Sequence, residues 1–159
     1  MTRAKPSAGL RLREVNRKRI APGDRHDWRW PRMLARATTA TLAVLAVAQA
    51  VFAGSFLDGQ YNALMLHSVG AKASTVLSVA QVIVLWFVSR TGGPRWLVAV
   101  GALVTVLLVA EFASGDLRLT ALHVPLGVLL ITGILQLTAS VWRLPLTAGP
   151  TEQQPDATR

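Results

Sequence analysis

The stretch Leu119–Trp142, LTALHVPLGVLLITGILQLTASVW, decides the fold of this chain. Its only titratable side chain is His123, and the other residues are uncharged. The stretch is longer than the about 20 apolar residues that cross a bilayer as a helix, so we expect it to span a membrane. An imidazole near one end of a span is unusual, because a polar group in hydrocarbon needs a partner. The sequence therefore predicts a membrane protein in which His123 has a specific task.

The composition agrees with a small membrane protein of several spans. The 159 residues are 52% hydrophobic and only 16% charged, which is too apolar for an ordinary soluble domain. The sequence has no cysteine, which excludes disulfides, thiol catalysis, iron–sulfur clusters and covalently attached c-type haem. No Ser/His/Asp arrangement, phosphate loop or metalloprotease motif occurs, so nothing in the sequence indicates a hydrolase, and a protein without enzymatic activity is favoured.

Hydropathy divides the chain into two polar tails and one transmembrane domain, residues 33–143. The predicted spans are 37–57, 63–89, 96–112 and 119–142. Residues 1–32 and 144–159 are polar and contain several prolines, so we expect mostly disordered tails. Ala48-Gln49-Ala50 is similar to a signal-peptide cleavage site, but the apolar region is too long for one, so we expect a retained helix. Within it, Gln49 is expected to make an interhelical hydrogen bond.

Positive charge is concentrated near the N-terminus. Residues 1–36 hold nine arginines and two lysines against three acidic residues, in a chain of net charge +9. Arg90, Arg95 and Arg143 flank spans on the same side, so the positive-inside rule places both termini in the cytoplasm. We expect the basic tail to contact the anionic lipid headgroups of the membrane. Since no recognition motif accompanies this charge, nucleic acid is not an expected partner.

The second half of the chain resembles the first. His67 opens the second span and His123 the fourth, and each is followed after nineteen residues by a tryptophan, Trp86 or Trp142. A short turn with Asp and Gly precedes each histidine. Spans two and four run in the same direction, so both histidines are expected at the same depth, in the outer leaflet. The sequence predicts an all-α transmembrane bundle of two repeated helix pairs.

Two histidines that face each other inside a membrane bundle are typical of a b-type haem site, in which iron takes two axial imidazoles. Gly70 and Gly127, each about one turn after a histidine, would leave bare backbone for a flat ligand. Arg118 lies near the outer surface, where it could pair with haem propionates. Zinc fits less well, because a structural site takes four ligands and only Glu111 and Asp116 remain as further candidates.

The pattern His67-x-x-Gly70 at the start of span two and His123-x-x-x-Gly127 at the start of span four resembles one four-helix half of the haem A synthase family. It is also similar to small bacterial four-helix membrane proteins with a fourth helix of the LHVPLG type. The resemblance covers residues 37–143 and implies that the two histidines ligate one haem b. The family's second half is missing here, and Leu64 stands where its catalytic glutamate would be, so the family's enzymatic activity is not expected.

We therefore expect a multi-pass protein of the cell membrane that binds one haem b through His67 and His123. Its role would be electron transfer or haem handling, with a membrane redox protein as partner. The alternative is a cofactor-free accessory or scaffold subunit whose inner helix faces are closed by small residues. Each histidine taken alone favours this alternative, because an interfacial histidine often only hydrogen-bonds a loop carbonyl. Transport is less favoured, since no span has a broken middle with paired charges.

The charge distribution predicts the topology. A reporter fused after Arg159 should behave as cytoplasmic, because nearly all arginines in the loops lie on the side of the two termini. Alkaline phosphatase and green fluorescent protein fusions measure this. Phosphatase activity at this position would indicate an odd number of spans and contradict the four-span topology.

Overall fold

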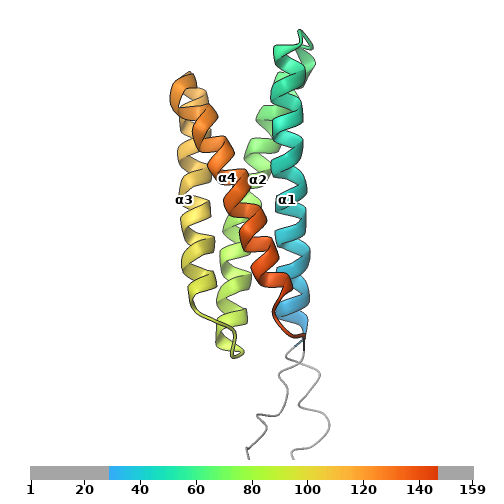
Figure 1. Cartoon of the computed structure of the whole chain (residues 1–159), viewed down its shortest axis with the longest axis vertical. Helices are drawn as coiled ribbons and strands as arrows, with labels where there is room; N and C mark the ends of the chain where they lie inside the picture. The colour runs from blue at the N-terminus through green and yellow to red at the C-terminus, as the bar shows by residue number, and fades with distance from the viewer. Residues whose placement is uncertain (1–28, 147–159) are drawn as a thin grey trace, which may run out of the picture.

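The computed structural model describes residues 29–146, which form a bundle of four α-helices (Figure 1). The helices are α1 (Trp30–Leu57), α2 (Asn62–Arg90), α3 (Trp96–Asp116) and α4 (Thr120–Trp142). Each is long and apolar enough to cross a membrane. The prediction of an all-α protein with four candidate membrane spans is confirmed. The disorder predicted for the two tails falls almost entirely on residues 1–28 and 147–159, which lie outside the described residues.

Three helices are longer than their predicted spans, α1 and α3 by several residues and α2 by one residue at each end. Helix α1 begins at Trp30, so residues 30–32 belong to a helix and not to a disordered tail. Pro31 lies in its first turn, where the missing N–H has no helical partner to lose. Helix α3 continues beyond residue 112 to Asp116, so that Glu111 lies inside the helix. The predicted spans end near the first charged residue, whereas helical hydrogen bonding continues past it.

Each helix packs against two neighbours. Helices α1 and α3 both contact α2 and α4, while the described parts of α1 and α3 do not pack on each other, nor do those of α2 and α4. Helices α2 and α4 are therefore diagonal partners across the centre of the bundle. The described chain begins and ends at the same end of the bundle (Figure 1). That this end is cytoplasmic stays a prediction from the basic residues.

Close packing holds the half of the bundle that carries the chain ends. Gly101 lets α3 approach α2, because an added Cβ would lie 2.7 Å from Cδ1 of Leu85. In hydrocarbon such close contact, rather than the hydrophobic effect, holds helices together. The buried apolar side chains form two clusters: Ala35, Val84, Leu85, Val88, Leu97, Leu137 and Val141 near the chain ends, and Leu42, Ala46, Val104, Leu130 and Ile134 farther in.

Toward the α1–α2 and α3–α4 turns the two helical hairpins separate, which gives the bundle an open V shape (Figure 1). The fully buried residues near these turns are small, Ala63 and Ser114. No cluster of buried apolar side chains joins the hairpins at this end of the described structure. The bundle is therefore packed at one end and open at the other, and both candidate histidines lie in the open half.

Two arginines of α1 bind the chain where α4 ends. Arg36 donates to the carbonyl oxygens of Trp142 and Leu144 at 2.9 and 2.8 Å, and its guanidinium lies over the Trp142 ring. Arg32, which is buried, donates to the carbonyl oxygen of Pro145. These contacts satisfy carbonyls that a helix C-terminus leaves without partners. They fix α4 to α1 at the closed end of the bundle.

This arrangement predicts that Arg36→Ala destabilises the bundle by about 1–3 kcal/mol, the range for lost hydrogen bonds to a charged group. Thermal unfolding in detergent measures the effect. Arg90→Ala is a matched control, because the Arg90 guanidinium also lies over a tryptophan ring, Trp86, but its side chain makes no hydrogen bond within residues 29–146. Equal losses in both variants would show that the carbonyl contacts of Arg36 add nothing.

Candidate functional site

The ring of His67, on α2, is oriented by the neighbouring helix α1. Its Nδ1 atom lies 3.2 Å from the backbone oxygen of Gln49. A carbonyl only accepts hydrogen bonds, so Nδ1 carries the proton and Nε2 keeps a free lone pair. The interhelical hydrogen bond expected of the Gln49 side chain is not formed: both amide atoms are buried without a partner in the described part of the chain. The backbone of Gln49 makes the interhelical contact instead.

The ring of His123, on α4, is oriented in the same way by α3. Its Nδ1 atom lies 3.1 Å from both the backbone oxygen and Oε1 of Glu111, and 3.2 Å from Oγ of Ser114. The Ser114 hydroxyl donates its own proton to the Glu111 backbone oxygen at 2.8 Å. All these oxygens can therefore accept from Nδ1–H, and Nε2 again keeps a free lone pair.

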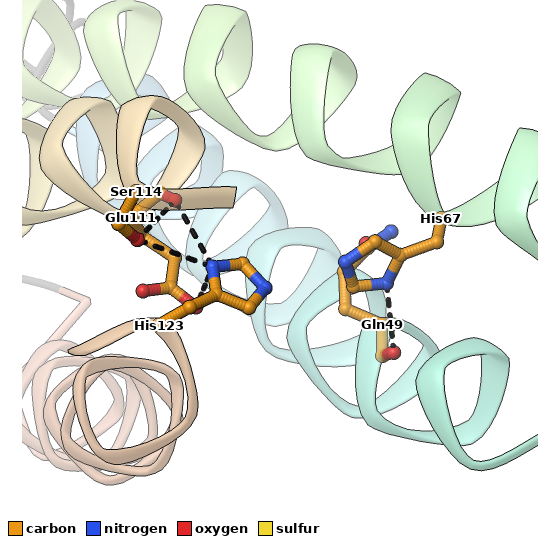
Figure 2. A network of polar contacts seen from close by, with 5 residues as sticks. All are labelled: Gln49, His67, Glu111, Ser114 and His123. Atoms are coloured by element: carbon orange, nitrogen blue, oxygen red, sulfur yellow. Dashed lines mark hydrogen bonds and ion pairs between the residues drawn. The ribbon is translucent and has the colours of Figure 1, made fainter. Parts of the chain in front are cut away.

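The two imidazoles face each other across the centre of the bundle. Their ring centroids are 6.1 Å apart and their planes are inclined by 75°. In Figure 2 the ring nitrogens that carry no dashed line, which are the two Nε2 atoms, point toward one another. Neither Nε2 atom makes a hydrogen bond to another residue within 29–146. Two lone pairs so directed repel each other, so the arrangement favours an electropositive group between the rings.

A cavity of about 400 Å³ adjoins the histidines, within the range of small-molecule sites. Alanine, leucine, isoleucine and valine form most of its wall, and the polar lining residues are Gln49, His67, Ser74, Glu111 and His123. Several lining residues on α1 and α4, including Leu57, Val124 and Val128, are exposed. The cavity therefore opens sideways between α1 and α4, where a membrane would place lipid.

The predicted glycines have different positions from those expected. Gly127 lines the cavity, and an added Cβ would lie 2.9 Å from Oε1 of Glu111. Gly70 is not among the lining residues; the Gln49 amide occupies the space that a Cβ would need there. Each glycine thus accommodates a polar side chain of the neighbouring helix, Gln49 or Glu111. That either glycine leaves bare backbone for a ligand stays a prediction, and of the two only Gly127 lines the cavity.

Arg118 is not brought to the histidines. It lies in the α3–α4 turn with φ of 59°, and it is exposed and not among the lining residues. The left-handed backbone at this position closes the turn between two long helices. The expected pairing of Arg118 with haem propionates therefore has no support in the geometry.

The sequence prediction missed the partners of His123. Glu111 was considered only as a further zinc ligand, whereas its side chain is only 16% exposed and lies against His123, and Ser114 was not considered. The available signal was the carboxylate itself, since an acidic residue within membrane depth is a functional candidate. Within the described residues no group of three or more His, Cys, Asp or Glu could hold a metal ion. Glu111 contacts the Nδ1 side of His123, which does not complete a zinc site at Nε2.

The fold and the site define a four-helix integral membrane protein with two opposed histidines and a cavity beside them. No family model matches the chain, and neither a curated protein nor a solved structure matches it. The resemblance to the haem A synthase family therefore depends on the sequence pattern alone.

The position of Gly127 predicts the effect of a methyl group. In Gly127→Ala the new Cβ would displace the Glu111 carboxylate from His123, since the two would be 2.9 Å apart. We expect a loss of stability of about 1–3 kcal/mol and a changed ¹⁵N resonance of the His123 ring. Gly133→Ala is the control on the same helix, because its Cβ would only touch Val104 at 4.0 Å. Identical His123 resonances in both variants would contradict the contact.

Proposed function

We propose that this protein binds one haem b between α2 and α4, with His67 and His123 as its axial ligands. The observation that carries the proposal is the direction of the two rings. Each Nδ1–H is held by an oxygen of the neighbouring helix, and each Nε2 faces the other. Histidines that ligate metals usually donate the other ring N–H to a carbonyl or a carboxylate in this way.

The spacing of the rings supports two ligands on one metal ion. Two imidazoles bound at about 2 Å each, with the ring centre about 1 Å behind each nitrogen, have centroids about 6 Å apart. The observed separation is 6.1 Å. The observed separation of the rings thus supports the proposal of one ion held between them.

The donor set favours haem over a bare ion. Two imidazoles satisfy only the axial positions of an iron, and a porphyrin brings the other four ligands itself. The mostly apolar wall of the cavity suits a macrocycle and its lateral opening gives access from the membrane. When bound, haem would supply one-electron redox chemistry. The protein's own residues would orient the two imidazoles and keep water from the site.

Electron transfer or haem handling in the membrane follows from such a site. The cofactor-free scaffold is the second candidate, and the hydrogen bonds at both Nδ1 atoms favour it to the extent that they satisfy the histidines without a ligand. In the haem-binding function the two Nε2 atoms would ligate iron, whereas in the scaffold function they would bind no ligand. Haem titration separates them directly.

The proposal predicts that the purified protein takes up one equivalent of haemin in detergent and gives a low-spin spectrum of bis-imidazole type. His67→Ala and His123→Ala should each abolish the low-spin form, because each removes one axial ligand. Visible absorption and electron paramagnetic resonance measure this.

His26→Ala is the matched control, since His26 is the third histidine of the sequence and is not one of the two proposed ligands. It should leave the spectrum unchanged. If the wild-type protein takes up no haem, the haem proposal fails and the scaffold function is the remaining candidate. Unchanged uptake by the His67→Ala/His123→Ala double variant would show that haem binds elsewhere.

A further inference from the structure

The two histidines are held by unequal partners. We propose that Glu111 acts as a positioning residue that makes His123 the principal axial ligand and leaves His67 as the exchangeable one. This inference rests on the proposed haem site. It concerns which face of the iron could open to an external ligand, and its basis lies in the hydrogen bonds on the far side of each ring.

His123 is fixed by three oxygens of one helix. The backbone oxygen and Oε1 of Glu111 and Oγ of Ser114 all lie 3.1 or 3.2 Å from its Nδ1. One of these oxygens belongs to a carboxylate, and a hydrogen bond to a charged acceptor is about twice as strong as one to a neutral acceptor. The ring is therefore held tightly and its Nε2 becomes a better electron donor.

The carboxylate has no other strong partner in the described structure. Oε2 of Glu111 is buried and accepts no hydrogen bond from the residues within 29–146, and the His123 ring is the one basic side chain among them within 4.0 Å of this carboxylate. Gly127 leaves the room that this carboxylate occupies, because a Cβ there would approach Oε1 to 2.9 Å. The position of Glu111 is thus set by the same helix that carries His123.

His67 has a weaker attachment. Its Nδ1 meets a single neutral acceptor, the backbone oxygen of Gln49, at 3.2 Å. The Gln49 side chain lies against Gly70, as the Glu111 side chain lies against Gly127 in the other hairpin. The Gln49 amide, however, makes no hydrogen bond to His67 or to any other described residue. One neutral acceptor restrains rotation of the ring less than three oxygens that share the Nδ1–H and include a carboxylate oxygen. The iron–His67 bond is therefore the one expected to open first.

The test compares the haem affinity of variants on the two sides. His67→Ala should retain haem in a five-coordinate, high-spin form that binds carbon monoxide in the ferrous state. His123→Ala should bind haem more weakly than His67→Ala. Glu111→Gln, which keeps both histidines, should lower haem affinity by about 10- to 100-fold and raise the midpoint potential, because the ferric iron loses electron donation.

Two control variants test whether the effect of Glu111→Gln comes from the position of Glu111 beside His123, and not from the loss of any carboxylate or polar side chain. Asp116→Asn removes a carboxylate of the same helix that lies outside the histidine contacts, and should change neither affinity nor potential. Gln136→Ala removes an exposed amide side chain of α4 that does not line the cavity, and should also leave both unchanged. Equal haem loss in both histidine variants, or an unchanged potential in Glu111→Gln, would overturn the inference.

A measurement without haem keeps this inference distinct from the haem proposal. In the ligand-free protein, the Nδ1 proton of His123 should exchange with solvent more slowly than that of His67, and Glu111→Gln should remove the difference. If the wild-type protein binds no haem, the proposed function fails whatever the exchange rates are. If the protein binds haem but the two protons exchange at equal rates, the inference of unequal ligands is contradicted while the proposed haem binding stands.

Discussion

The hydrogen bonds at the two histidine Nδ1 atoms constrain the open half of this bundle more than any apolar contact. A membrane offers no water to an imidazole N–H, so the proton must be accepted by a neighbouring helix. Gln49 accepts it on one side and Glu111 with Ser114 on the other. Once these bonds are made, the rings cannot turn, and each Nε2 atom is directed at the opposite hairpin. The direction of the candidate ligands thus follows from the need to satisfy the donors behind them.

The two ends of the bundle have different packing because they contain different side chains. Near the chain ends, Gly101 and Ala35 allow the helices to come close, and Arg36 ties α1 to the end of α4. At the other end, the side chains of Gln49 and Glu111 lie against Gly70 and Gly127. They occupy the space that apolar side chains would fill. The hairpins consequently separate there, and the cavity forms between them (Figure 1). A rigid closed end allows a small opening at the other end to persist without a packed core.

The sequence was sufficient for the four helices and for the meeting of His67 and His123, because span length and span direction depend on hydropathy and turn position alone. It was insufficient for what surrounds the histidines. Which oxygen accepts a proton depends on the rotation of each helix about its axis, and apolar spans without strong periodicity leave that rotation open. Gln49 was expected to bond through its side chain, and the structure uses its backbone oxygen. Glu111 was considered only as a candidate zinc ligand, and its contact with Nδ1 of His123 was not predicted.

The separation of packed and open ends also limits how electrons could reach a haem in this site. The histidines lie in the half opposite the chain ends, and the apolar clusters fill the other half. If the basic residues set the orientation as proposed, the cavity opens in the outer leaflet. A redox partner would then meet the cofactor from the lipid between α1 and α4 or from the outer surface. Transfer across the membrane would need a second carrier, because no second pair of histidines lies within the described helices.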